Sequence, residues 1–480
     1  MAHDFEEIYS FCEFVDRFMS LHNGVDLHQF DLLFIVYCES DLIDVGFRVG
    51  TWILQATRSN VERICLELNQ VPPFTLPVGV WNCAFLRELE LNLHTGTLIL
   101  PNTSVSRIEI LTLKRLRVSV DLLGKLILSC KWLKKLHLYD VYGFDELNIN
   151  SSLLEHLQID NFCLNGDGMK LKVSADRLKY LSILYKWGGV DHSLRLHAPR
   201  LERFYWSGNV FNYSYEGDFG SLKHADISII PSPNFGDEYE AAFKRIMVRV
   251  LETVYGVSSL CVSDLAIKEL SLSEVWQEFC NLRSLTLISK DLGLGNTIPS
   301  MVSLLNSTPY LDTLEIRLSC LDYSNDEDYE DSSDDGDSTE MISSYNAEYW
   351  EAQNLKFVDF LKNVEMEIDG EQNEIDLIKY LLKNAKELEK MTIFYSSNAS
   401  PRLSVISRKL QHFQKVSSSI VFKVASTYGF KVLVSNYSSL WFLNWLYTSS
   451  SAADIHYADM LPPIALMLEY GTVFGISLLA

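Results

Sequence analysis

The segment Leu86-Arg-Glu-Leu-Glu-Leu91 contains the pattern that decides the fold: apolar, two residues, apolar, one residue, apolar. The pattern recurs about fourteen times, with clear further copies in Ile108-Glu-Ile-Leu-Thr-Leu113 and Leu133-Lys-Lys-Leu-His-Leu138. Residues two apart in a strand point to the same side. The last two apolar residues of each copy can therefore stack on the equivalent pair of the next copy, while the first one closes the turn.

The spacing of the copies distinguishes between two β-rich folds. From Leu66 to Ile227, consecutive third apolar positions are 25, 22, 25, 21, 24, 23 and 21 residues apart. This period fits one strand plus one return segment per turn, whereas an antiparallel sandwich turns about every 8–12 residues. We therefore predict an α/β fold, a leucine-rich-repeat solenoid of horseshoe shape over residues 27–320. Two longer steps leave room for helices at 47–60 and 238–251 on the convex side.

Composition and charge narrow the class of protein. The chain has 480 residues, 48% of them hydrophobic, and a formal net charge of −22. So acidic a surface repels phosphate backbones, so nucleic acid is not an expected partner. The nine cysteines form no CxxC pair, and Cys65 and Cys261 lie within or beside predicted strands. Reduced thiols and an acidic start without an apolar signal run predict a cytoplasmic or nuclear location.

One acidic segment interrupts the repeats. Residues 321–340 contain ten acidic side chains and neither lysine nor arginine. Such a segment buries too little apolar surface to offset the entropy of ordering, so we expect a disordered loop over residues 321–350. Ser332, Ser333 and Ser338 lie among these acids and are candidate phosphorylation sites. The alternative is a loop that only increases solubility.

The residues that would indicate catalysis are missing. The eleven histidines are scattered, and the chain contains no HExxH, GxSxG, Walker A or GxGxxG motif. Carboxylate pairs are common in so acidic a chain, so none can be selected for acid and base chemistry. We predict a binding protein rather than an enzyme, with no cofactor and no metal site.

A family resemblance is carried by the stretch from Phe360 to Ile393. Phe360-Leu-Lys-Asn-Val-Glu-Met-Glu-Ile-Asp-Gly370, Glu374–Ala385 and Leu388-Glu-Lys-Met-Thr-Ile393 resemble the FBD domain of plant F-box/leucine-rich-repeat proteins. The periodicity of the same stretch independently predicts a strand, a helix and a strand. We assign residues 355–425 to an FBD-like continuation of the solenoid, with a weaker further strand at 420–424.

The N-terminal part resembles the same family through Phe14-Val-Asp-Arg17. The resemblance implies the substrate-recognition subunit of a Skp, cullin and F-box ubiquitin ligase, in which the repeats hold a target and the F-box docks the adaptor. Only about ten residues precede Phe14. We therefore expect residues 1–26 to be a remnant that follows a missing F-box, which leaves the binding of a Skp-type adaptor in doubt.

The C-terminal residues 426–480 depart from the family pattern and are expected to form a divergent apolar tail. Pro462, Pro463 and Glu469 interrupt its apolar run, so membrane contact is not expected.

The predicted binding surface consists of the residues between the paired apolar positions of each strand. These candidate residues are Glu90, Thr112, His137, Gln158, Ser182, Tyr205, Asp226, Thr286 and Glu315. Tyr205 and Trp206 form the expected anchor region because aromatic residues dominate interface hot spots, although the repeat position of Trp206 predicts a core residue. The leading hypothesis is a scaffold for an unidentified target protein. The alternatives are an adaptor or competitor outside the ligase and a repeat domain that senses a small molecule.

Overall fold

The computed structural model describes most of the repeat region and parts of both ends. The described residues are 2–21, 26–35, 43–69, 73–99, 107–144, 146–161, 170–185, 193–208, 212–216, 219–229, 237–264, 266–267, 278–289, 297–318, 345–368, 371–395, 420–424, 464–467 and 473–479.

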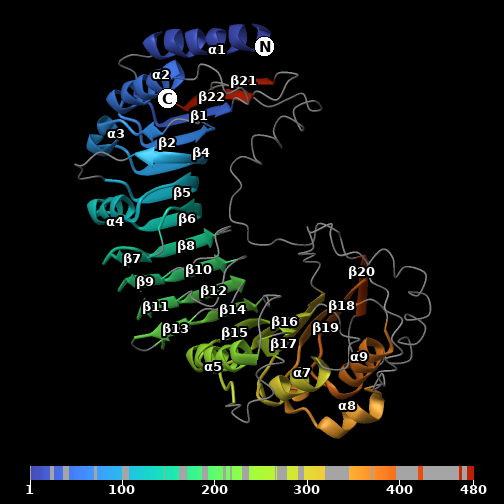
Figure 1. The fold of residues 1–480 in the computed structure, drawn as a ribbon. Coiled ribbons are helices and arrows are strands. Elements are labelled where there is room, and N and C mark those ends of the chain that lie inside the picture. The colour runs from blue at the N-terminus through green and yellow to red at the C-terminus, as the bar shows by residue number, and fades with distance from the viewer. Residues whose placement is uncertain are drawn as a thin grey trace.

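One long sheet runs through the molecule and follows a curved path (Figure 1). Its repeat strands are parallel and paired in chain order. They are β1 (Gln29–Ile35), β2 (Arg63–Leu68), β4 (Glu88–Ile99), β5 (Ile110–Arg117), β6 (Lys135–Tyr142), β8 (His156–Asn161), β10 (Tyr180–Tyr185), β12 (Arg203–Gly208), β14 (His224–Ile229), β15 (Ser259–Ser263), β16 (Ser284–Ser289), β17 (Thr313–Leu318), β18 (Asn363–Ile368), β19 (Lys390–Tyr395) and β20 (Ile420–Val424). The predicted parallel leucine-rich-repeat array is therefore present, and β20 includes the weaker predicted strand.

The repeat apolar residues form a continuous core. In the three copies quoted above, each of the three apolar side chains is at most 2% exposed, as in Leu86, Leu89 and Leu91. The stacking follows from register, because Leu89 lies opposite Leu111 and Leu91 opposite Leu113. Burial of such side chains contributes about 1.5–3 kcal/mol each, and in a repeat array these contributions come chiefly from neighbouring turns.

Helices cover the back of the sheet at both ends of the array. The first group consists of α2 (Ile43–Arg58), α3 (Val78–Asn82) and α4 (Val120–Ser129), and the short strand β3 (Phe74–Thr75) pairs with β4. The second group consists of α5 (Asp237–Val254), α7 (Thr297–Asn306), α8 (Ala347–Gln353), the 3-10 helix η1 (Lys356–Asp359) and α9 (Gln372–Asn384). Both predicted helices, at 47–60 and 238–251, are present as α2 and α5. Helix α2 begins four residues earlier and ends two residues earlier than predicted, whereas α5 extends beyond the prediction at both ends.

The central repeats return through strands instead of helices. β7 (Glu146–Asn150), β9 (Lys170–Ser174), β11 (Ser193–His197) and β13 (Asn212–Tyr215) form a second, four-stranded parallel sheet. Its buried residues alternate, as in Leu171 and Val173. The 23-residue period indicated a return segment without indicating its type, and this second sheet was not predicted.

The FBD-like region continues the array as predicted. β18, α9 and β19 follow one another as strand, helix and strand, and β18 lies parallel to β17. The start of α9 is fixed by a capping box, in which the backbone N–H of Glu371 donates to the Glu374 carboxylate at 2.8 Å. Such reciprocal capping satisfies backbone donors that a helix start otherwise leaves unpaired.

The end of the predicted acidic loop differs from expectation. Helix α8 begins at Ala347, inside the range 321–350 assigned to disorder, because Asn346 accepts a hydrogen bond from the backbone of Tyr349 at 3.0 Å. Trp350 is fully buried, which offsets the entropy of ordering this turn. Residues 321–344, with Ser332, Ser333 and Ser338, lie outside the described residues.

The first strand of the array is covered by residues from both ends of the chain (Figure 1). Helix α1 (Ala2–Leu21) contacts α2 through Asp16, which accepts hydrogen bonds from Trp52 Nε1 at 2.6 Å and Arg48 Nη1 at 2.8 Å. On the sheet itself, β22 (Val473–Leu479) pairs antiparallel with β1, and β21 (Ile464–Met467) pairs with β22. Within the ranges predicted as an N-terminal remnant and a divergent tail, the described residues 2–21 form a packed helix, and residues 464–467 and 473–479 form a strand pair.

Candidate protein-binding face

The nine predicted binding residues form one row across the open face of the sheet. Each lies directly opposite the next in register, from Glu90 on β4 to Glu315 on β17, and β15 adds Cys261 between Asp226 and Thr286. We call these nine residues and Cys261 the predicted row. The repeat pattern therefore places residues as distant in sequence as Glu90 and Glu315 in one row of the folded sheet. It does not establish what they bind.

The exposure of the row is uneven. Glu90 and Thr112 are each only 8% exposed, which corrects the expectation of an open surface there, whereas the other members are half-buried. The N-terminal end of the row is therefore covered by its own neighbours. Trp206, next to Tyr205, is fully buried, so only Tyr205 of that predicted anchor pair reaches the face.

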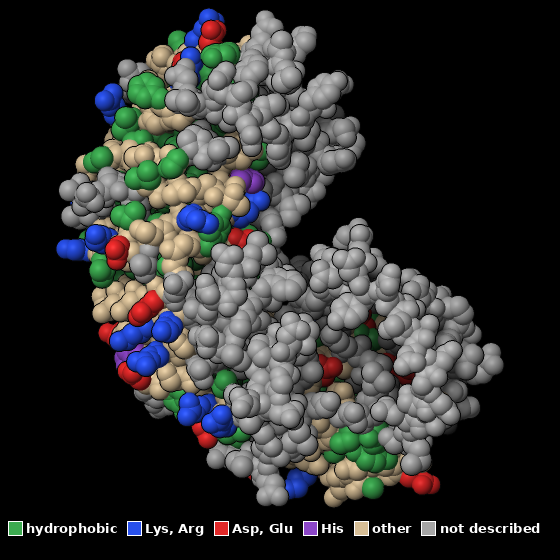
Figure 2. Space-filling model, in the orientation of Figure 1, with side chains coloured by type: hydrophobic (Ala, Val, Ile, Leu, Met, Phe, Trp, Pro, Cys, Tyr) green, Lys and Arg blue, Asp and Glu red, His purple; other side chains and the backbone are tan. Residues whose placement is uncertain are grey.

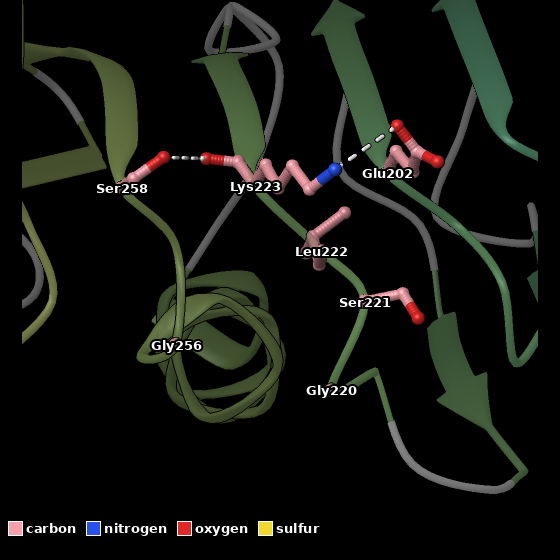
Figure 3. A pocket seen from close by; sticks show the side chains of 7 residues that line it. All are labelled: Glu202, Gly220, Ser221, Leu222, Lys223, Gly256 and Ser258. Carbon is pink, nitrogen blue, oxygen red and sulfur yellow. Dashed lines mark hydrogen bonds and ion pairs between the residues drawn. The ribbon is translucent and has the colours of Figure 1, made fainter.

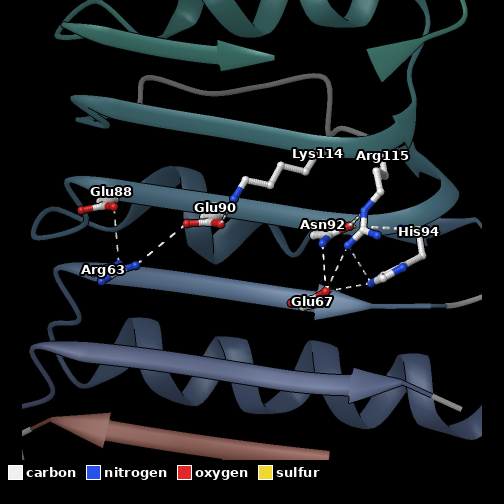
Figure 4. A network of polar contacts seen from close by, with 8 residues as sticks. All are labelled: Arg63, Glu67, Glu88, Glu90, Asn92, His94, Lys114 and Arg115. Atoms are coloured by element: carbon white, nitrogen blue, oxygen red, sulfur yellow. Dashed lines mark hydrogen bonds and ion pairs between the residues drawn. The ribbon is translucent and has the colours of Figure 1, made fainter. Parts of the chain in front are cut away.

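Neighbouring charges explain why Glu90 is covered (Figure 4). The Glu90 carboxylate lies 2.6 Å from Lys114 Nζ and 3.9 Å from Arg63 Nη2. Arg63 also reaches Glu88 at 3.4 Å. These ion pairs join β2, β4 and β5 across the face, which leaves Glu90 satisfied inside the protein.

A second part of this network centres on Glu67 of β2 (Figure 4). One Glu67 oxygen lies 3.0 Å from Asn92 Nδ2, 2.9 Å from His94 Nε2 and 3.2 Å from Arg115 Nη2. His94 and Arg115 have positive φ values of 44° and 47°, and the register between β4 and β5 shifts after Asn92. Bulges of this kind redirect side chains. Here the bulge occurs where the side chains of His94 and Arg115 contact Glu67.

The central strands have a different surface. Beside the predicted row, two residues earlier on each strand, lies a second in-register row that sequence reasoning missed: Lys135, His156, Tyr180, Arg203 and His224. The His156 and Tyr180 rings are stacked with centroids 5.2 Å apart, and Tyr180 lies 5.2 Å from Tyr205 of the predicted row. The same period-two alternation that selected the predicted row would have found this one.

Burial and positive neighbours set the protonation of these central residues. Burial, with smaller effects of His156 and Lys135, lowers the pKa of His137 to about 4, so this imidazole is neutral near pH 7. Burial and then Lys135 also lower the pKa of His156. Burial raises the pKa values of Tyr180 and Tyr205, which keeps both phenols protonated.

At the C-terminal end the row is acidic and internally hydrogen-bonded. Asp226 accepts a hydrogen bond from Ser228 Oγ at 2.9 Å, and burial raises the pKa of its carboxyl. Glu315 accepts from Thr286 Oγ1 at 3.1 Å and pairs with Arg317 Nε at 2.6 Å. Cys261 is a free, half-buried thiol on the open face, not a core residue, and burial raises its pKa.

A ladder of alternating charges borders the open face, at the residue that precedes each strand. In chain order it consists of Glu62, Arg87, Glu109, Lys134, Glu155, Lys179, Glu202 and Lys223. The backbone carbonyl of each of these residues accepts two N–H groups from the next repeat. For example, the N–H groups of Glu109 and Ile110 both donate to the carbonyl of Arg87. Side chains of neighbouring repeats also form ion pairs along this ladder, such as Lys134 with Glu109 at 2.6 Å and Lys179 with Glu155 at 3.1 Å. We call these eight residues the edge ladder.

A shallow pocket of about 260 Å³ lies at the edge ladder and not on the open face (Figure 3). It is lined by Glu202, Gly220, Ser221, Leu222, Lys223, Gly256 and Ser258. Lys223 pairs with Glu202 at 3.4 Å, and Ser258 Oγ donates to the Lys223 carbonyl at 3.1 Å. Glu202, Lys223 and Ser258 are engaged with one another, and the pocket does not lie inside the curve, where a small-molecule sensor would need it.

Two kinds of feature are absent from the described part of the chain. Within it, no group of three or more His, Cys, Asp or Glu side chains could hold a metal ion. No helix among the same residues is both long and apolar enough to cross a membrane.

Comparison with known proteins matches both halves of the chain. Residues 49–210 match the family model of the leucine-rich repeats of FBD-associated F-box protein At5g56370, and residues 353–393 match the FBD model. FBD-associated F-box protein At1g66310 of Arabidopsis thaliana is 25% identical over 401 residues, 81% of this chain and 78% of the relative. F-box/LRR-repeat protein 13 of the same plant is 24% identical over 438 residues, 87% and 84% of the two chains. These matches confirm the resemblance of this chain to the plant F-box/FBD/leucine-rich-repeat proteins.

Proposed function

We propose that the chain is a protein-binding scaffold whose curved array is a horseshoe solenoid and whose open sheet face holds a partner protein. The observation that carries this proposal is the predicted row, in which one residue from each of ten consecutive strands, β4 to β17, faces the same side. A rigid strand scaffold orders these side chains in advance, which lowers the entropic cost of binding.

We further propose that the bound partner is a target for ubiquitylation. This step rests on the similarity to relatives that are named F-box and leucine-rich-repeat proteins. In this proposal the repeats select the target, and the chain acts by binding rather than by catalysis. The neutral His137 and the engaged carboxylates of Glu90 and Glu315 are consistent with recognition.

The scaffold proposal can be tested by site-specific crosslinking in plant cell extract. A photoreactive benzoylphenylalanine replaces Ser182, at the centre of the predicted row, or Asn148, on the exposed side of the second sheet as the matched control. We expect a discrete protein adduct from position 182 and none of that mass from position 148. Adducts from position 148 alone would contradict binding at the open face.

The ligase proposal needs a separate measurement. A purified Skp-type adaptor is incubated with the recombinant chain and with a version that carries a grafted F-box. Adaptor binding by the chain itself would support the ligase proposal. Binding by the grafted version alone would reject it for this chain and favour an adaptor that works outside the ligase.

A further inference from the structure

The second row on the central strands combines charge and aromatic surface in one line. We call Lys135, His156, Tyr180, Arg203 and His224 the basic-aromatic row. Direct register joins each residue to the next across β6, β8, β10, β12 and β14. With strands about 4.8 Å apart, the row spans roughly 19 Å, which corresponds to about six residues of extended peptide. The row contains no acidic side chain.

The aromatic members are already packed against one another. His156 and Tyr180 are stacked with an interplanar angle of 20° and a centroid distance of 5.2 Å, and Tyr180 continues onto Tyr205. All three side chains are half-buried, so each presents an edge or face while its position is held by neighbours. Ordered aromatic side chains lose little entropy on binding and are typical of interface hot spots.

The cations of the row lack the ion pairs found elsewhere on the sheet. Lys135 and Arg203 are exposed, and neither forms an ion pair with another described residue. The acids that come immediately before His156 and Arg203 belong to the edge ladder, where Glu155 pairs with Lys179 at 3.1 Å and Glu202 with Lys223 at 3.4 Å. In a chain of net charge −22, this is a local positive surface.

We propose that the basic-aromatic row is the binding site for an acidic peptide segment of the partner protein. The proposal rests on the proposed scaffold function and assigns the chemical class of its ligand. Carboxylates of the peptide would pair with Lys135 and Arg203, while side chains between them would lie on His156 and Tyr180. A row of this length fits an extended segment better than a small anion, because Lys135 and Arg203 lie three strand spacings apart, roughly 14 Å, and one small anion cannot reach both.

The neighbouring protonation states support the same assignment. Burial is the main cause of the lowered pKa of His156 and of His224, and the next causes are Lys135 and Arg203 respectively. Lys135 and Arg203 therefore disfavour further positive charge around them. A carboxylate placed between them would relieve that repulsion, which electrostatic complementarity across an interface commonly achieves.

The test uses the full chain and a phage-displayed library of random twelve-residue peptides. Selection is followed by fluorescence anisotropy of the recovered peptides against the unmodified chain, against Lys135→Gln/Arg203→Gln and against Lys170→Gln/Lys172→Gln. The last pair removes two exposed lysines from β9 of the second sheet, where Figure 2 shows lysine and arginine side chains on the outer flank. Circular dichroism verifies that all three proteins are folded.

We expect the selected peptides to be rich in Asp and Glu and to bind at least about tenfold more weakly to the Lys135→Gln/Arg203→Gln protein. Binding to the control protein should be unchanged, and binding to the unmodified chain should weaken as salt is added. Acidic peptides that are sensitive to Lys170→Gln/Lys172→Gln instead would overturn the assignment. So would displacement of the peptides by a single-stranded oligonucleotide that binds more tightly at the same row.

A fourth protein separates this inference from the scaffold proposal. Ser182→Arg blocks the centre of the predicted row with a bulky side chain. Selected peptides that are poor in acids but are lost with Ser182→Arg would overturn the acidic ligand and leave the scaffold in place. Peptides that no substitution on the sheet face affects would overturn both.

Discussion

The N-terminal and central strands of the open face show two opposite uses of charge on one repeat pattern. On β2, β4 and β5, Arg63 and Lys114 both pair with Glu90. Glu67 contacts three further polar side chains. On β6 to β12, Lys135 and Arg203 have no described ion-pair partner. Charges that neutralise each other hold strands together, whereas charges without partners remain available to a ligand.

The two regions also differ behind the face. Helices α2, α3 and α4 cover the N-terminal strands, whereas the second sheet covers the central ones (Figure 1). Between the two sheets lies an aromatic cluster in which Trp206 is 6.4 Å from Phe204 and 5.9 Å from Tyr213, measured between ring centroids. We infer that the central strands obtain their stability from this core, which leaves their outer side chains free to serve binding.

The largest expected effect is on this core. Trp206→Ala should lower the free energy of unfolding by about 3–5 kcal/mol, because it removes a large, fully buried side chain and leaves a cavity. Tyr205→Ala, one residue away on the open face, is the matched control and should cost much less. Urea unfolding followed by circular dichroism measures both. Equal losses would contradict the separation of core and binding side chains on β12.

The second prediction concerns the N-terminal network. Glu67→Gln should lower the free energy of unfolding by about 1–2 kcal/mol, because Arg115 and His94 lose a partly buried carboxylate. Arg203→Gln on the central face should change stability by less than about 0.5 kcal/mol. Parallel urea titrations check the pair. A larger loss of unfolding free energy for Arg203→Gln than for Glu67→Gln would contradict the inference that only the N-terminal charges stabilise the sheet.

Much of the fold could be predicted because the repeat pattern is local and periodic. The spacing of Leu89 and Leu91 sets both the strand and the side that is buried, and the period sets the parallel stacking. The second sheet was missed because its strands are only four or five residues long, and short alternation such as Leu171 and Val173 also fits loops. Helix α8 was missed because composition placed it in an acidic loop, whereas burial of Trp350 determines its order.

The candidate site was predictable in position but not in exposure. Alternation placed Glu90 and Tyr205 on the same side of the sheet, and register confirmed one row. The covering of Glu90 depends on Arg63 and Lys114, which lie 24 or more residues away and meet it only in the folded array. The basic-aromatic row was not predicted because only the residue between the paired apolar positions of each strand was considered. The residue two positions earlier on the strand faces the same side.

The third prediction uses pH to test the buried centre of the face. Because the pKa of His137 falls from about 6.5 in the unfolded chain to about 4 in the folded one, the unfolded state binds a proton first as pH falls. The stability that the neutral imidazole contributes is complete above pH 6.5 and is lost between about pH 6.5 and 4. At pH 5.5 the loss should be about 1.4 kcal/mol. His137→Gln should remove this component from urea titrations at pH 7.5 and 5.5, and an unchanged pH dependence would contradict the burial of His137.

The smallest expected effect is at the edge ladder, which borders both regions equally. Glu155 is half-exposed and Lys179 is exposed. Their ion pair should therefore contribute only about 0.2–1 kcal/mol to the free energy of unfolding, and less at high salt. A double-mutant cycle with Glu155→Gln and Lys179→Gln isolates that coupling. The ladder could also keep Glu155 away from the basic-aromatic row. In that case Lys179→Gln releases the Glu155 carboxylate, which then competes with the peptide for Lys135. Lys179→Gln should therefore weaken acidic-peptide binding more than Lys172→Gln, which removes one distant positive charge. Equal effects of Lys179→Gln and Lys172→Gln on peptide affinity would show that the ladder only aligns the repeats, and that the difference between the two regions lies entirely on the face.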